Sequence, residues 1–62
     1  GVPYIYGGEG GHYILYRIDG NIVNHNTITT QEEAITGLTS GLYILNIYTP
    51  ANEVKQAKII IQ

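Results

Sequence analysis

Short runs of alternating apolar and polar side chains follow one another along the chain, and turn-forming residues separate them. The strongest run spans residues 42–49, where both sets of alternating side chains are largely apolar. A strand with two apolar faces fits the centre of a sheet. We therefore predict a central strand at 42–49. After a turn that begins at Pro50, the alternating run at 54–62 is predicted to pair with it in the antiparallel sense.

Shorter strands are predicted before the central one, at residues 3–6, 12–18, 21–24 and 33–36. The Asp19-Gly20 pair between two apolar runs is typical of a two-residue hairpin turn. The polar residues 25–27 indicate a loop or a sheet edge. Thr29 and Glu32 match a helical capping box, which leaves a helical turn as the alternative at 33–36. A strand is favoured because no apolar stripe at helical spacing follows.

Glycine is concentrated at positions 7, 8, 10 and 11, on both sides of Glu9. Glycine adopts positive φ at little cost and sustains long strands poorly, so this segment is predicted to be a flexible turn. Six short strands, short connections and the lack of a convincing helical pattern favour a small antiparallel β-sandwich over a single flat sheet.

Composition agrees with a sheet and limits its stability. The apolar residues are chiefly Ile, Leu, Val and Tyr, without Phe, Trp or Met, and β-branched and aromatic side chains suit a pleated, half-buried surface. A chain of 62 residues has room for one domain, and a domain of this size buries only about 60% of its unfolded surface. Cysteine is absent, so no disulfide supplements the core. We expect residues 1–62 to form one marginally stable domain.

Charge and reactive groups argue against several classes of function. Three basic residues stand against five acidic ones and form no cluster that would neutralise a run of phosphates, so nucleic-acid binding is not expected. No apolar run approaches the ~20 residues that span a bilayer. His12 and His25 have no metal-ligand spacing with each other or with Glu32, and no hydroxyl has a suggested base. We therefore predict no catalytic residue, metal or cofactor, and no enzyme activity.

Three further features occur in a set order from residue 14 to residue 62. An apolar strand leads through a residue-Gly turn at Gly20 into a second, short apolar strand. A Leu-x-x-Gly-x-Tyr segment follows, formed by Leu38, Gly41 and Tyr43, and a lysine followed by aliphatic residues occupies 58–62. This order and spacing resemble the C-terminal sorting domains of cargo proteins of the type IX secretion system, gingipain-type proteases among them.

The resemblance implies an immunoglobulin-like β-sandwich of about six to seven strands, which serves as a secretion and sorting signal at the C-terminal end of a larger secreted protein. The outer-membrane translocation machinery would recognise the domain, and a sortase-like enzyme would remove it while the cargo is anchored at the cell surface. The domain would act by being bound, whatever the activity of its parent protein, proteolysis for example. The binding and sorting residues that the resemblance implies are Gly20, Leu38, Gly41, Tyr43, Lys58, Ile59, Ile60, Ile61 and Gln62.

Several of these residues also have a plain folding role. Gly41 fits a tight turn or the close passage of a neighbouring strand. Tyr43 would bury its ring while its hydroxyl reaches a backbone group. Lys58 lies between two residues expected to face inward, so its ammonium should point to solvent or to a receptor carboxylate. A terminal strand at a sheet edge would also allow a partner to add a strand by β-augmentation.

Two other functions stay open at this point. A β-sandwich of this size also fits a structural or adhesin-type spacer in a surface protein. Carbohydrate binding would use exposed tyrosines as stacking platforms, with Tyr4, Tyr6, Tyr13 and Tyr48 as candidates, although tyrosine is equally suited to a sandwich core. An open sheet edge would further allow two copies to dimerise by edge pairing or strand exchange.

Overall fold

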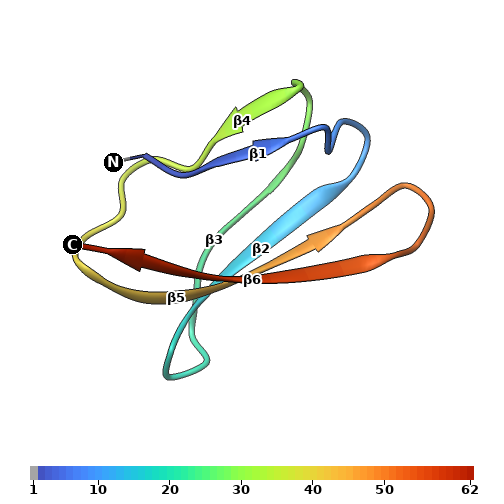
Figure 1. The fold of residues 1–62 in the computed structure, drawn as a ribbon. Helices are drawn as coiled ribbons and strands as arrows, with labels where there is room; N and C mark the ends of the chain where they lie inside the picture. Colours follow the sequence, from blue (N-terminus) through green and yellow to red (C-terminus); the bar gives the residue numbers. More distant parts are fainter. Residues whose placement is uncertain (1) are drawn as a thin grey trace.

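The computed structural model describes residues 2–62, and these residues form six β-strands and no helix (Figure 1). The strands are β1 (Tyr4–Tyr6), β2 (His12–Arg17), β3 (Ile22–Thr27), β4 (Glu32–Ala34), β5 (Gly41–Tyr48) and β6 (Val54–Ile61). β1 and β4 make a two-stranded sheet, and the other four strands make a sheet of order β3-β2-β5-β6. All pairings are antiparallel. The predicted small antiparallel β-sandwich is confirmed.

β5 lies inside the larger sheet, between β2 and β6. Its register with β6 is unbroken, from Gly41 opposite Ile61 to Tyr48 opposite Val54. Neighbouring strands pair with both of its edges, and after the exposed Gly41 its side chains are buried or half-buried on the core face and half-buried on the other face. The predicted central strand and its antiparallel partner are confirmed, with bounds within one residue of those expected.

The segments that had alternatives are both strands. The polar residues 25–27 belong to β3, which lies at one edge of the larger sheet. The helical turn considered for 33–36 is wrong, because residues 32–34 form β4 and pair with β1. The backbone N–H of Ile35 continues this pairing by donating to the carbonyl oxygen of Pro3 at 2.9 Å.

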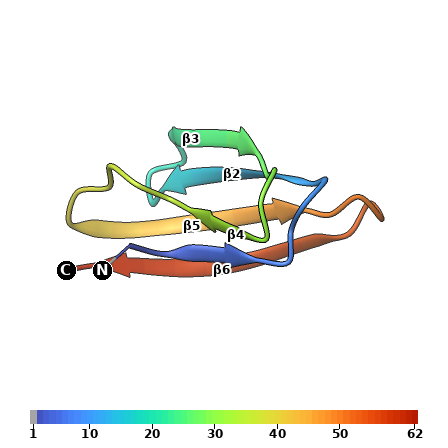
Figure 2. The ribbon, with the colours of Figure 1, turned by 90° about the horizontal axis from the view of Figure 1, so that it is seen from above.

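A flexible turn was predicted for the glycine-rich segment. The structure instead has a corner held by hydrogen bonds at these residues. Gly10 N donates to Ile28 O at 3.0 Å, and Ile28 N donates to Gly11 O at 2.9 Å. Gly7 N donates to Gln31 O at 2.9 Å, so the two chain segments stay paired across the corner. β1–β2 and β3–β4 thus form one long two-stranded ribbon, which bends so that β1 and β4 lie over one face of the larger sheet (Figures 1 and 2).

The core fills the space between the two layers. Tyr13 and Leu15 of β2 face it, with Tyr43 and Leu45 of β5 beside them on the same sheet. The opposite layer and its connections contribute three buried isoleucines, Ile5, Ile28 and Ile35. Four half-buried apolar residues pack against this cluster, namely Leu38, Ile47, Ile59 and Ile61. Each fully buried aliphatic side chain stabilises the fold by about 1.5–3 kcal/mol relative to an exposed one.

The β2–β3 hairpin has a three-residue loop, residues 18–20, and the two-residue turn expected from Asp19-Gly20 is wrong. Gly20 N donates to Arg17 O at 2.9 Å, and Arg17 N donates to Asn21 O at 2.8 Å. Gly20 has a φ of 93°, which fits a type I turn followed by a left-handed residue. Asn52 holds the same place after β5, with a φ of 64°.

Tyr13, a core residue with a part-buried hydroxyl, should make the fold sensitive to alkali. Burial first, and the Glu33 carboxylate second, raise its pKa above the usual value of 10.0. The unfolded chain releases this proton near pH 10, and the native chain only at higher pH. The resulting stabilisation is complete below the pKa of the unfolded chain and is lost as the pH rises through the native pKa.

We therefore expect Tyr13→Phe to lose less stability than the wild type between about pH 9 and about pH 11, measured as the urea midpoint at each pH. Tyr6→Phe is the matched control, since Tyr6 is 68% exposed, and it should keep the wild-type loss. An equal loss in Tyr13→Phe and the wild type would contradict the prediction.

Candidate functional site

The residues of the sorting motif lie at one end of the four-stranded sheet. Arg17, the last residue of β2, is opposite Tyr43 near the start of β5, and Tyr43 is opposite Ile59 near the end of β6. The β2–β3 turn with Gly20 therefore projects from the end at which β5 begins and β6 ends, as Figure 2 shows. We call this region the motif end. Its residues are Gly20, Leu38, Gly41, Tyr43 and 58–62.

Tyr43 fixes the way in which the chain enters β5. Its ring is buried, and its hydroxyl donates to the backbone oxygen of Thr39 at 2.7 Å, so the predicted hydroxyl–backbone bond is present. Gly41 lies between these two residues with a φ of 155°, which other residues rarely adopt. A Cβ at Gly41 would meet only the Tyr43 ring, at 3.8 Å. Backbone conformation therefore requires this glycine, and close passage of a neighbouring strand does not.

The last strand divides its motif residues between two faces. Ile59 and Ile61 pack against the core, and Lys58 and Ile60 point to the opposite, uncovered face, where Ile60 is 67% exposed. Leu38 and Tyr43 likewise belong to the interior side of the motif end. The motif thus consists of one set of side chains that holds the fold together and another set, with Gln62, that is exposed at the surface.

β6 is an edge strand with a regular backbone. It pairs with β5 through eight consecutive residues without a register shift. β3, at the other edge, carries an irregularity, because Val23 has no opposite residue in the register with β2. Lys55 lies on the same edge strand as Lys58 but faces the other way, since it is opposite Ile47 and Lys58 is opposite Ile44. The sorting motif does not include Lys55, and its three-residue spacing from Lys58 becomes informative only once both residues are placed on one edge strand.

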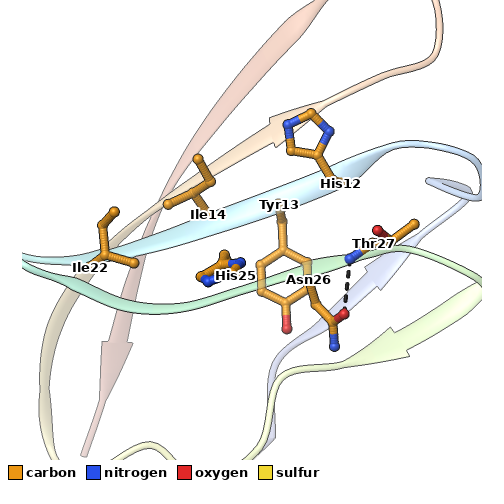
Figure 3. Close-up of a pocket in the computed structure, with 7 residues that line it drawn as sticks. All are labelled: His12, Tyr13, Ile14, Ile22, His25, Asn26 and Thr27. Carbon is orange, nitrogen blue, oxygen red and sulfur yellow. Dashed lines mark hydrogen bonds between the residues drawn. The ribbon is translucent and has the colours of Figure 1, made fainter.

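A surface depression lies along β2 and β3, and residues from both faces of these strands line it, with Ile14 on the uncovered face and Tyr13 on the core side (Figure 3). His12, Ile14, Ile22 and His25 line it, and the His12 ring stacks on Tyr48 with a centroid distance of 4.7 Å. Residues 2–62 contain no group of three or more His, Cys, Asp or Glu side chains that could hold a metal. The depression therefore offers an aromatic and apolar surface.

The tyrosines considered as stacking platforms differ in exposure. Tyr13 is only 2% exposed and belongs to the core, which is the alternative role considered for these tyrosines. Tyr48 is half-buried and stacked on His12. Tyr4 and Tyr6 are exposed side by side on β1, with ring centroids 6.1 Å apart. These two tyrosines lie on the smaller sheet, outside the motif end.

Comparison with known families gives one result that covers most of the chain. A family model described as "Secretion system C-terminal sorting domain" matches residues 8–62. Comparisons with curated proteins and with solved structures gave no significant match. Within the described residues, no helix is long and apolar enough to cross a membrane.

The matched stretch begins in the glycine corner and contains β2 to β6 with every residue of the motif end. Domains of this family are signals and not catalysts. They direct cargo of the type IX system across the outer membrane, to the cell surface or the medium, and they interact with the secretion machinery to do so. The chain belongs to the family of secretion system C-terminal sorting domains.

Proposed function

We propose that residues 1–62 work as one sorting domain, carried at the C-terminal end of a larger secreted protein and without catalytic activity of its own. The outer-membrane translocation machinery recognises the exposed side chains of the motif end, and a sortase-like enzyme then separates the domain from its cargo. One observation carries the proposal: residues that are far apart in sequence converge at one end of the sheet.

The division of the motif into buried and exposed residues supports this mechanism. Ile59 and Ile61 anchor the end of β6 on the core, so the exposed Lys58 and Ile60 are held in fixed positions on a paired strand. A backbone that is already ordered loses little conformational entropy on binding, which favours recognition by a receptor. The folded sandwich is therefore the signal, and its outward-facing terminal residues are the part that is contacted.

The test is the surface display of a reporter protein fused upstream of the 62 residues, in a bacterium with a type IX system. The double variant Lys58→Gln and Ile60→Thr changes exposed side chains and leaves Ile59 and Ile61 on the core. We expect display to fall at least about tenfold, since a loss of about 1.4 kcal/mol in receptor binding has that effect. The reporter should then accumulate in the periplasm.

Val54→Thr is the matched control, because Val54 lies on the same face of β6 as Ile60 but at the opposite end, and is 59% exposed. It should display the reporter at the wild-type level. Urea unfolding of the isolated variants should give midpoints close to that of the wild type. Wild-type display of the double variant would show that the exposed motif residues are not what the machinery recognises.

A further inference from the structure

We propose that β6 accepts an extended, acidic strand from a partner protein, in which two carboxylates three residues apart pair with Lys58 and Lys55. This inference rests on the proposed function, because it names the partner chemistry of the same terminal strand. It goes beyond that function by assigning Lys55, the register of the partner strand and the pattern of its side chains.

The backbone of β6 is the best template for strand addition among the described strands. It is eight residues long, and its pairing with β5 has no register shift. β1 and β4 have three residues each. In β3, the extra residue Val23 disturbs the ladder, and the Asn26 side-chain oxygen accepts a hydrogen bond from Thr27 N. Bulges commonly protect an edge strand from pairing with another chain. β3 has this protection, whereas the regular β6 does not.

The charges of β6 select the kind of strand that fits. Its residues include two lysines and no Asp or Glu. Lys55 and Lys58 lie on opposite faces of the strand, so an added strand meets one ammonium on each face. A second copy of β6 would bring lysines and no carboxylate to this edge, which disfavours self-pairing. Opposite charges in directly facing cross-strand positions are favourable, and like charges are unfavourable.

The register then defines the partner sequence. In an antiparallel strand, the residues opposite Ile61, Ile60 and Ile59 would be apolar, and the next residue, opposite Lys58, would be acidic. Two small or polar residues follow, and a second acidic residue lies opposite Lys55. The residues opposite Ile59 and Ile61 would extend the row of side chains that packs against the core. Backbone pairing supplies affinity in this mode, and the side chains supply the register.

Lysines on an edge strand have a competing explanation, since they also prevent edge-to-edge aggregation. The two explanations differ in what they predict for peptides. A purely protective pair of lysines discourages any added strand, whereas a recognition pair prefers an acidic strand over a basic one of the same shape. Reversal of the charges on β6 should reverse the preference only if the lysines recognise the partner.

The experiment is a titration of the isotope-labelled 62-residue chain with an eight-residue peptide of three valines, glutamate, two serines, glutamate and valine. We expect amide shifts along β6, and at least about tenfold weaker binding of the matched peptide with lysine in place of both glutamates. The variant Lys55→Glu with Lys58→Glu should prefer the lysine peptide. The neutral variant Lys55→Gln with Lys58→Gln should bind both peptides alike.

Absence of binding, equal binding of the two peptides by the wild-type chain, or no reversal in the charge-reversed variant would each overturn the inference. These measurements use the purified chain and are independent of export. Loss of display in the Lys58 and Ile60 double variant together with no peptide preference would remove only the acidic-strand inference. Peptide preference together with unchanged display would instead contradict the proposed function.

Discussion

Gly11→Ala is expected to remove a large part of the free energy of unfolding of the protein. Gly11 is buried immediately before β2, and an added Cβ would overlap the backbone oxygen of Tyr48. A carbonyl group in a paired strand cannot rotate away, so the pair formed by His12 and Tyr48 must separate. We expect a loss of more than about 3 kcal/mol, against a total stability of roughly 3–9 kcal/mol for a domain of this length.

Gly8→Ala is the matched control for this prediction. A Cβ at Gly8 would meet side-chain ends, Ile28 Cδ1 at 3.0 Å and Ile5 Cγ2 at 3.3 Å. These methyl groups can shift, so the loss should be about 1 kcal/mol. Urea unfolding followed by circular dichroism measures both variants. Equal midpoints for Gly8→Ala and Gly11→Ala would show that the contact with the Tyr48 oxygen does not decide the outcome.

The strands of the C-terminal half could be predicted because their alternation is unbroken. Side-chain orientation in a strand has a period of two, so the run at 42–49 indicates a strand inside the sheet, with one face largely buried and the other half-buried. The same period separates Ile59 and Ile61, on the core side, from Lys58 and Ile60. The surface and the interior of the motif end could thus be distinguished from the sequence alone.

The corner between the two layers could not be predicted, and the reason is the irregularity at Val23. One extra residue reverses the face of every side chain that follows it, and the polar residues 25–27 indicated a loop or a sheet edge without showing where the ribbon bends. Ile28, an isolated apolar residue beyond them, is completely buried. Glycines such as Gly11 are common to flexible turns and tight corners, and only the close approach of a second strand identifies the corner.

The residues of the candidate site could be proposed from the sequence, but their convergence at one end of the sheet could not. Order and spacing along the chain identify the motif, whereas its convergence depends on the register of β2 and β6 with β5. Sequence spacing alone also fails to identify Lys55. Its spacing from Lys58 acquires meaning only once β6 is known to be an open, regular edge. Sheet topology therefore supplies the step from a list of motif residues to a surface that a partner can contact.

The corner at Ile28 carries the second large effect on stability. Ile28 has 0% exposure, and its N–H and C=O are both paired with glycines of the opposite segment. Ile28→Ala leaves the backbone bonds in place and removes the side chain that fills the bend between the two sheets. We expect a loss of about 3 kcal/mol, because a large aliphatic residue is truncated in a site that relaxes only partly.

Ile22→Ala separates this packing effect from the general cost of replacing a β-branched residue in a strand. Ile22 lies on β3, the strand that precedes Ile28, and is 57% exposed. The loss of stability in Ile22→Ala should therefore stay below about 1 kcal/mol. The urea midpoint should fall much further for Ile28→Ala, with an unchanged slope if the unfolded state exposes the same surface. If the two variants unfold at the same urea concentration, the bent ribbon is held by its backbone pairing, and the packing of Ile28 does not stabilise the sandwich.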